Sequence, residues 1–269
     1  MVGQQFIALL ANHPWFHVAW LGASQRSEGK SYREATAWRL PAPLPDEIGR
    51  LEVDAATPGR APQLVFSALD SSVAGEIETA FAGAGHLIVS NSRNHRMDEM
   101  VPLLIPEINA DHLALLEVQA SRCGWKGRIV TNPNCSTVVM AMALAPLRQF
   151  GLEAVTITTL QAISGAGYPG VASWDILGNV IPFIDGEEAK IETEPKKILG
   201  TLTAGRVDMH PMKITAQTTR VPVHDGHTES ISVALDQAPT EEAMIDAWNT
   251  FKGRPQALGL PSAPQQPIV

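Results

Sequence analysis

The sequence predicts an α/β fold in which an incomplete, doubly wound (Rossmann-like) parallel sheet is followed by an α+β domain. Short apolar runs alternate with helical patterns through the first half of the chain, as in βαβ units with a parallel sheet. After Gly151 the apolar runs lengthen and alternate with period two, which is typical of a sheet with one solvated or interface face. We therefore expect two domains, residues 1–133 and residues 134–269.

The elements follow from these patterns in chain order. In the first domain, residues 4–12 read as a helix because apolar positions recur every three or four residues, and the Val-, Ile- and Leu-rich runs read as strands. The expected strands there are Phe16–Leu21, Leu64–Ala68, His86–Val89, Leu103–Ile105 and Arg128–Val130, with helices at Ser71–Phe81 and Asp111–Ala120. In the second domain we expect strands at Glu153–Ile163, Met212–Arg220 and Glu229–Leu235, and helices at Glu187–Leu199 and Thr240–Phe251.

Bulk composition narrows the class of protein. A hydrophobic content of 45% and a charged content of 18% over 269 residues fit a globular protein with a sizeable core. The net charge of −8 argues against nucleic acid or an anionic membrane as a partner. Two cysteines, no signal-peptide pattern and no apolar run of about 18 residues predict a cytoplasmic protein without a disulfide framework.

The hexapeptide Asn132-Pro133-Asn134-Cys135-Ser136-Thr137 is the most informative motif, because it places a thiol at a strand-to-helix junction. Asn134 is the expected N-cap of the helix that follows. Unpaired N–H groups and the helix dipole stabilise a thiolate there, so we expect the pKa of Cys135 to fall below about 8.5, the value of a free cysteine. The alternative is a small buried residue without chemistry.

Three further residues supply groups for acyl transfer. His227 shares a loop with His224, and a histidine near neutrality can exchange a proton with the thiol; the residues alone leave the choice between the two histidines open. Gln161 ends a strand beside a glycine-rich turn and can orient a carbonyl. Arg220 ends another strand and can bind a carboxylate through two parallel hydrogen bonds, although a surface salt bridge is the common alternative.

Two charged segments complete the set. Glu187 and Lys190 lie three apart on one helix face, which suits either an exposed ion pair or a zwitterionic ligand. The segment Asn91–Met97 carries two arginines after a strand, which suits an anion such as phosphate; a solvated loop is the alternative. We expect no bound metal.

Taken together and in this order, the motifs resemble the aspartate-β-semialdehyde dehydrogenase family in its fungal and archaeal branch. The matching text comprises Arg96-Met97-Asp98, Val101-Pro102-Leu103, Pro106-Glu107-Ile108-Asn109, Asn132–Thr137, Gln161–Gly167, Glu187–Lys190, Lys197-Ile198-Leu199, Arg220–Val223 and Gly226-His227. The resemblance runs through nearly the whole chain. It implies NADPH-dependent reductive dephosphorylation of β-aspartyl phosphate to aspartate semialdehyde, a step toward lysine, methionine and threonine.

The resemblance also implies roles for individual residues. Cys135 is the nucleophile that forms a thioacyl enzyme, His227 is the general acid/base and Gln161 orients the intermediate. Arg220 binds the substrate α-carboxylate, Glu187 its amino group, and Arg96 and Lys190 the phosphate, with Asn134 also counted among the substrate-binding residues. The second domain is then the catalytic and dimerisation domain of a homo-oligomer, a dimer or tetramer.

The first domain is then a partial NADP-binding domain. After its second expected strand, Ser24, Arg26 and Ser27 suit the extra phosphate of NADP, where an acidic residue would select NAD. Gly3 is all that remains of the expected glycine-rich turn.

The ends of the chain suggest a shortened form, because the first strand and a C-terminal segment of the family pattern are not found. We therefore expect weakened or lost NADPH binding, little turnover and a rearranged first domain. Two alternatives stay open: a non-catalytic shortened isoform that acts only by association, and the related N-acetyl-γ-glutamyl-phosphate reductase.

Overall fold

A computed structural model describes every residue, Met1–Val269, and divides into two units. Unit 1 comprises Met1–Pro102 and Ala114–Asn132, and unit 2 comprises Leu103–Leu113 and Pro133–Val269. The sequence-based boundary between residues 133 and 134 differs at Leu103–Leu113. This segment belongs to unit 2, because Leu103 and Ile105 are buried in the same apolar cluster as Ala141 and Ile198.

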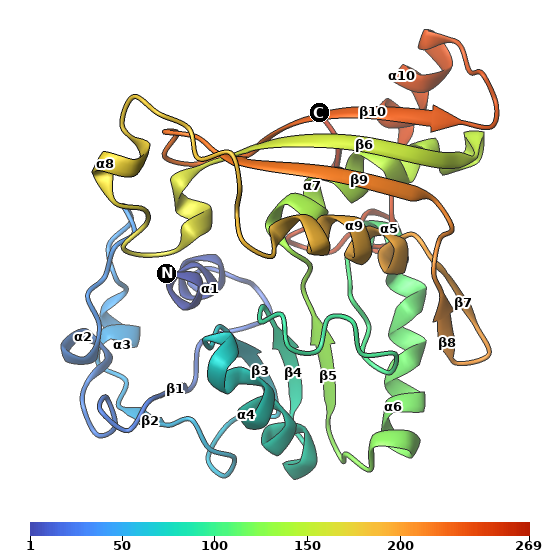
Figure 1. Cartoon of the computed structure of the whole chain (residues 1–269). Coiled ribbons are helices and arrows are strands. Elements are labelled where there is room, and N and C mark those ends of the chain that lie inside the picture. Colours follow the sequence, from blue (N-terminus) through green and yellow to red (C-terminus); the bar gives the residue numbers. More distant parts are fainter. The chain divides into compact units, whose positions relative to one another are not determined.

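Unit 1 contains two separate parallel sheets (Figure 1). One has the order β1-β2 and the other the order β3-β4-β5, and all three strand pairings are parallel, as expected for a Rossmann-like domain. The strands are β1 (Leu21–Ala23), β2 (Val53–Ala55), β3 (Leu64–Ser67), β4 (Leu87–Ser90) and β5 (Arg128–Thr131).

Two of the strands predicted for the first domain are not found as predicted. The strand expected over Phe16–Leu21 is displaced, since only Leu21–Ala23 finds a partner, in β2. Residues Leu103–Ile105 form no strand, because they pack as an extended segment against the apolar cluster of unit 2 instead. Apolar character alone does not distinguish a strand from a buried extended segment that lacks a pairing edge.

Capping residues mark both ends of the longest helix of unit 1. Asp70 accepts a hydrogen bond from the Ser72 N–H at the start of the longest helix, and Gly85 ends that helix in the left-handed conformation. The α-helices are α1 (Val2–Leu10), α2 (Tyr32–Ala35), α3 (Asp46–Gly49), α4 (Ser71–Ala84) and α6 (Leu115–Cys123). The helix expected over Asp111–Ala120 is present as a 3-10 segment, Ala110–Ala114, that leads into α6.

Unit 2 is built on a mixed sheet of the order β10-β6-β9. Its strands are β6 (Leu152–Gln161), β9 (Lys213–Arg220) and β10 (Thr228–Leu235); β6 pairs with β10 in antiparallel and with β9 in parallel fashion. A separate antiparallel pair, β7 (Thr201–Thr203) and β8 (Arg206–Asp208), completes the strands. β6 and β9 alternate buried and more exposed residues, and β10 alternates half-buried and exposed ones, so only one face of the sheet is part of the core.

Helices α7 and α9 pack on the buried face of this sheet (Figure 1). These elements share one apolar cluster, which includes Met140, Leu144, Val155, Ile157 and Ile191. The other face carries mostly threonine and serine, with Leu160 42% exposed. The α-helices of unit 2 are α5 (Pro106–Asn109), α7 (Cys135–Leu144), α8 (Ser173–Ile176), α9 (Glu187–Ile198), α10 (Glu241–Thr250) and α11 (Arg254–Ala257), with 3-10 segments at Ala145–Phe150 and Ile163–Ala166.

No helix in the structure combines the length and apolar character that a membrane crossing requires.

Candidate active site

Cys135 is the first residue of α7, and Asn134 caps that helix. The Asn134 Oδ1 atom accepts hydrogen bonds from the Ser136 N–H at 3.0 Å and the Thr137 N–H at 3.2 Å. These are two of the donors that a helix start leaves without a partner. The cap therefore ends the preceding segment at a defined point and presents the Cys135 thiol, which is exposed, at the surface of unit 2.

Asn134 is itself held by two glutamates of α9. Its backbone N–H donates to Glu194 Oε2 at 2.7 Å, and its Nδ2 donates to Glu187 Oε1 at 2.7 Å. Both carboxylates are buried, and they lie seven residues apart on one helix face. The position of the thiol therefore depends on contacts between α9 and the cap.

The electrostatic environment of Cys135 differs from the sequence-based expectation, which was a lowered pKa. Burial of the sulfur's surroundings raises the pKa of the Cys135 thiol, and the nearby Glu187 carboxylate raises it further. Backbone N–H groups of the first turn and the Arg220 guanidinium oppose this but do not outweigh it. The effect of the helix start is present, but burial and, after it, the Glu187 charge exceed it. The resting group is therefore the thiol.

His227 lies against the thiol, with its Nε2 atom 3.1 Å from Cys135 Sγ. The Ala162 N–H donates to His227 Nδ1 at 3.1 Å. Because a backbone N–H can only donate, Nδ1 accepts, and the single proton of the neutral ring lies on Nε2, from which it points to the sulfur. Burial and the Arg220 charge lower the pKa of His227, against an opposing effect of Glu187, so the ring is neutral at pH 7.

His224 lies elsewhere in the same loop. Its side chain is 95% exposed and its Nδ1 contacts the carboxylate of the neighbouring Asp225. The structure thus brings only one of the two loop histidines to the thiol, a distinction that the residues alone left open.

Gln161 and Arg220 are adjacent in the register of β6 and β9. Both are buried, and Arg220 Nη1 donates to the Ala162 carbonyl at 2.7 Å. The other guanidinium nitrogens make no hydrogen bond within the chain and are available to a ligand. Burial lowers the pKa of Arg220, while the neighbouring Glu187 and Cys135 raise it, and the side chain stays charged at neutral pH.

Glu187 connects the remaining site residues. Its Oε1 atom accepts from Asn134 and, at 3.2 Å, from Gln161 Nε2, and its Oε2 accepts from Lys190 Nζ at 2.9 Å. Burial opposes ionisation of this carboxyl, but the hydrogen bonds from Lys190, Asn134 and Gln161 outweigh it, so the pKa of Glu187 is lowered. Seven of the predicted site residues belong to unit 2: Asn134, Cys135, Gln161, Glu187, Lys190, Arg220 and His227.

Two residues of the site were missed by sequence reasoning. The first is Glu194. It lies seven residues after Glu187, a spacing that places both side chains on one helix face and could have identified it. The second is Gly165, where an added Cβ atom would lie 2.7 Å from Arg220 Nη1 and 3.0 Å from His227 Cε1. Glycine is needed there because the backbone passes directly beside both side chains.

The remaining predicted residues belong to unit 1. Arg96 is buried and donates from Nη2 to the Asn91 carbonyl at 2.9 Å. Ser24 directly follows β1, and Arg26 and Ser27 lie in the turn after it, with Arg26 exposed. Gly3 lies in the first turn of α1. Hydroxyl and guanidinium donors at the end of a parallel strand fit the phosphate of a dinucleotide.

The chain matches two family models. Residues 1–116 match the NAD binding domain of semialdehyde dehydrogenases, and residues 144–267 match the semialdehyde dehydrogenase dimerisation domain. Aspartate-semialdehyde dehydrogenase of Archaeoglobus fulgidus is 46% identical over 270 residues, covering 100% of this chain and 78% of the relative. The Cryptococcus neoformans enzyme of the same name is 47% identical over 283 residues, covering 100% of this chain and 77% of the relative.

Solved structures agree with these matches. The crystal structure of Candida albicans aspartate semialdehyde dehydrogenase with NADP has a TM-score of 0.91 at 41% identity, over 98% of this chain and 78% of that one. A Vibrio cholerae aspartate semialdehyde dehydrogenase II has a TM-score of 0.71 at 25% identity, over 93% of this chain and 76% of that one.

Alkylation should distinguish the two cysteines. We expect iodoacetamide to label Cys135 faster than Cys123, because Cys135 is exposed and receives a hydrogen bond from His227, whereas Cys123 is half-buried. Since the pKa of Cys135 is raised, its labelling rate should keep rising above about pH 8.5. Peptide mapping by mass spectrometry measures both rates, with Cys135→Ser as the control. Faster labelling of Cys123, or a rate at Cys135 that levels off below pH 7, would contradict this description.

Proposed function

Because the chain belongs to the aspartate-semialdehyde dehydrogenase family, we propose that it catalyses the NADPH-dependent reductive dephosphorylation of β-aspartyl phosphate to aspartate semialdehyde. The observation that carries the proposal is the placement of the Cys135 thiol at a capped helix start, 3.1 Å from a neutral histidine. Acyl transfer to a thiol requires such a nucleophile with a hydrogen-bonding partner.

Cys135 is the proposed nucleophile. Its thiolate attacks the acyl carbon, a C–S bond forms, and the C–O bond to phosphate breaks with its electron pair leaving on the phosphate. The product is a thioester on Cys135, in which the acyl carbon stays activated toward a nucleophile. When bound, NADPH would supply the hydride for this carbon; the C–S bond then breaks, its electron pair returns to Cys135 Sγ, and the aldehyde leaves.

His227 first acts as a hydrogen-bond donor in this proposal. The Nε2–H points to Cys135 Sγ in the resting site and would stabilise the thiolate once the proton of the thiol has left. To take the proton of the thiol as a general base, the ring must release the Ala162 N–H from Nδ1 and adopt the other tautomer. The general acid/base role implied by the resemblance therefore includes this exchange.

The charged residues suit the ends of the substrate. We assign the α-carboxylate to the unengaged guanidinium nitrogens of Arg220, since a bidentate fork matches a carboxylate. Glu187 is assigned to the substrate ammonium, Lys190 and Arg96 to the phosphate, and Gln161 to the thioacyl intermediate. Within unit 2, the Glu187 and Lys190 charges already face each other at 2.9 Å, and an incoming zwitterion would exchange partners with that pair.

We propose that the 2′-phosphate of NADP is held by Ser24, Arg26 and Ser27. Gly3 is proposed to lie near the pyrophosphate of the same cofactor. The support is the position of the turn at the carboxyl end of β1 and the absence of a carboxylate among these residues. Calorimetric titration with NADPH tests this assignment directly.

The two rival functions are less well supported. N-acetyl-γ-glutamyl-phosphate reductase would bind an acylated nitrogen without charge, and the ionised, buried Glu187 suits a free ammonium better. A non-catalytic isoform would have no use for the contact between His227 and Cys135.

The reverse reaction tests the function. We expect NADPH formation from aspartate semialdehyde, phosphate and NADP, followed by absorbance, and at least tenfold less with N-acetylglutamate semialdehyde. Cys135→Ser should abolish the signal, and Cys123→Ser is the matched control that should retain it. Equal rates with both semialdehydes would reject the substrate assignment. NADPH binding with no turnover of either semialdehyde would support the non-catalytic isoform.

His227 and His224 offer a matched pair of substitutions. His227→Ala should lower turnover by about 10²–10⁴-fold, the usual range for a histidine that handles a proton, whereas exposed His224→Ala should leave it within about twofold. His227→Gln keeps an N–H donor but cannot exchange a proton, so partial activity in that variant would show how much the hydrogen bond contributes alone. Comparable losses for both alanine variants would overturn the assignment.

The match to a dimerisation domain indicates an oligomer, and we propose a homodimer or a tetramer formed through unit 2. The open face of the β10-β6-β9 sheet, with Leu160 exposed, supports this face as the contact. Light scattering at micromolar concentration should give at least twice 28.9 kDa. Leu160→Lys should shift the distribution toward monomer, with exposed Val180→Lys as the control. A monomer at every concentration would contradict the proposal.

A further inference from the structure

β9 is an edge strand of the sheet in unit 2, and glutamate side chains bond part of its outer edge. The Thr218 N–H donates to Glu188 Oε1 at 3.2 Å, and the Ala216 N–H donates to Glu192 Oε1 at 3.1 Å. Both glutamates are half-buried and belong to α9, which packs against β9. The carboxylates thus occupy the place that a neighbouring strand would take, and the proposed chemistry assigns no role to either of them.

The spacing of the two contacts fits the geometry of both elements. Glu188 and Glu192 lie four residues apart in a helix, which places them on one face and about 6 Å apart along the axis. Ala216 and Thr218 lie two residues apart in a strand, so their N–H groups point to the same edge and are about 6.6 Å apart. Because these spacings match, α9 bonds both groups at once. A shift of α9 by one residue would rotate both carboxylates away by about 100°.

The edge of β9 is fixed as far as the site. The next outward N–H belongs to Arg220 and donates to the Ile181 carbonyl at 2.8 Å, and the Ile181 N–H donates to the Arg220 carbonyl at 2.9 Å. Three successive outward N–H groups, at Ala216, Thr218 and Arg220, therefore have partners. The last of them belongs to the residue that carries the guanidinium.

α9 bonds a second element through its other two glutamates. Glu187 and Glu194 accept hydrogen bonds from Asn134, which caps α7 directly before Cys135. Four glutamates of one helix therefore hold the start of α7 on one side and the edge of β9 on the other. The nucleophile and β9 share α9 as their common support.

We propose that Glu188 and Glu192 are positioning residues, which fix the spacing between Glu187 and Arg220 and thereby set the affinity for a substrate with an ammonium and a carboxylate on one carbon. Glu187 directly precedes Glu188, and Arg220 lies two residues after Thr218, so the contact at 3.2 Å joins the two elements close to both charges. The inference rests on the proposed function, which assigns the ammonium to Glu187 and the α-carboxylate to Arg220. Two groups on one carbon leave little tolerance in that spacing, and a misplacement of about 1 Å can cost about 10²-fold in rate.

Amide hydrogen exchange resolved to single residues tests the contacts without any turnover. Glu188→Leu should speed exchange at the Thr218 amide at least tenfold, and Glu192→Leu should do the same at Ala216. Glu188→Gln and Glu192→Gln keep an oxygen acceptor, so exchange should stay within about threefold of the unsubstituted chain. Unchanged exchange in both Leu variants would overturn the proposal.

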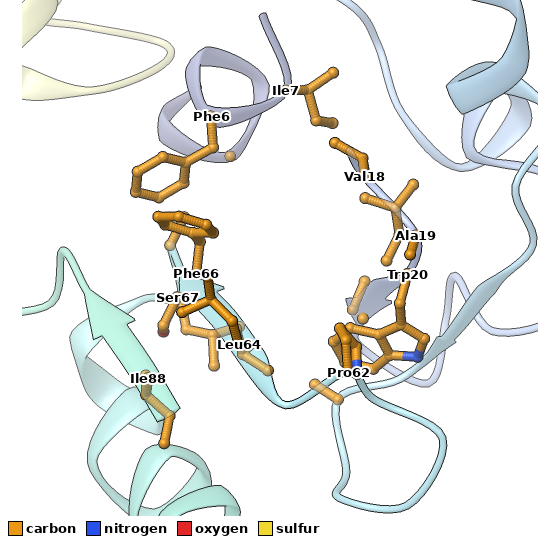
Figure 2. A pocket seen from close by; sticks show the side chains of 18 of the residues that line it. Phe6, Ile7, Val18, Ala19, Trp20, Pro62, Leu64, Phe66, Ser67 and Ile88 are labelled. Atoms are coloured by element: carbon orange, nitrogen blue, oxygen red, sulfur yellow. The ribbon is translucent and has the colours of Figure 1, made fainter. Parts of the chain in front are cut away.

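β3 is the reference strand in this experiment. It is also an edge strand, and its residues Leu64 and Phe66 line an apolar cavity of unit 1 (Figure 2). Exchange at the β3 amides should be the same in all variants, because the α9 contacts to β9 lie in unit 2. An equal rise at β3 and β9 would show a general loosening of the fold and would contradict a specific role of the two glutamates.

Protection of Cys135 from alkylation distinguishes positioning of the substrate groups from support of the fold. Iodoacetamide carries no charge, so its rate at Cys135 should stay within about twofold in Glu188→Leu. Aspartate semialdehyde should protect Cys135 in the unsubstituted chain. Glu188→Leu should need at least tenfold more of it for the same protection, and Glu188→Gln less than threefold more. Glu241→Leu removes an exposed glutamate of α10 and is the matched control, which should change neither value.

The outcomes separate this proposal from the proposed function. No protection of the unsubstituted chain by aspartate semialdehyde would contradict both. Protection of Glu188→Leu at the same concentration as the unsubstituted chain would overturn the positioning role alone. Equal losses in Glu188→Leu and Glu188→Gln would also overturn it, since the second variant keeps the acceptor. So would an alkylation rate at Cys135 that changes as much as the protection does.

Discussion

Hydrogen bonds at Asn134 fix the geometry on which the rest of the site depends. The side-chain oxygen of Asn134 caps α7, and its two donors are held by Glu187 and Glu194 of α9. The chain is thereby fixed immediately before Cys135. A buried carboxylate that lost its partner would pay a desolvation cost, so this arrangement resists small displacements of the thiol. Helix α9 therefore has a structural task in addition to carrying Lys190.

The same glutamate that orders the site also raises the energy of the thiolate. Glu187 raises the pKa of Cys135, whereas the helix start and Arg220 lower it, and burial decides the balance. His227 contributes a hydrogen bond from a neutral ring, because the Ala162 N–H occupies Nδ1 and Arg220 disfavours the imidazolium. A resting thiol beside a neutral histidine follows from these contacts. Activation of the sulfur then depends on changes in the charges around it, such as a ligand cation at Glu187.

The sequence predicted more of the site than of the sheet edges. The Asn-Cys-Ser-Thr pattern gave the cap, because capping is a local property of four residues. The strands of unit 2 were placed closely by their period-two alternation, which also placed Gln161 and Arg220 at strand ends. The pKa of Cys135 was predicted in the wrong direction, because its largest cause is burial in the folded chain, and the second is the charge of Glu187, 52 positions later in the sequence. The pairing of strand edges could not be predicted from the local sequence either. Phe16–Trp20 has the composition of a strand but no partner strand, and the division of unit 1 into two sheets depends on contacts between distant segments.

The central claim is that Cys135, positioned by Asn134 and Glu187, forms a thioester with the substrate. Incubation of the protein with β-aspartyl phosphate in the absence of NADPH, followed by acid quenching and peptide mass spectrometry, tests it most directly. We expect an aspartyl adduct on the peptide that contains Cys135, its loss in Cys135→Ser, and a lower yield in Asn134→Ala. An adduct on Cys123, or phosphate release without any covalent adduct in a protein that turns over with NADPH, would contradict it.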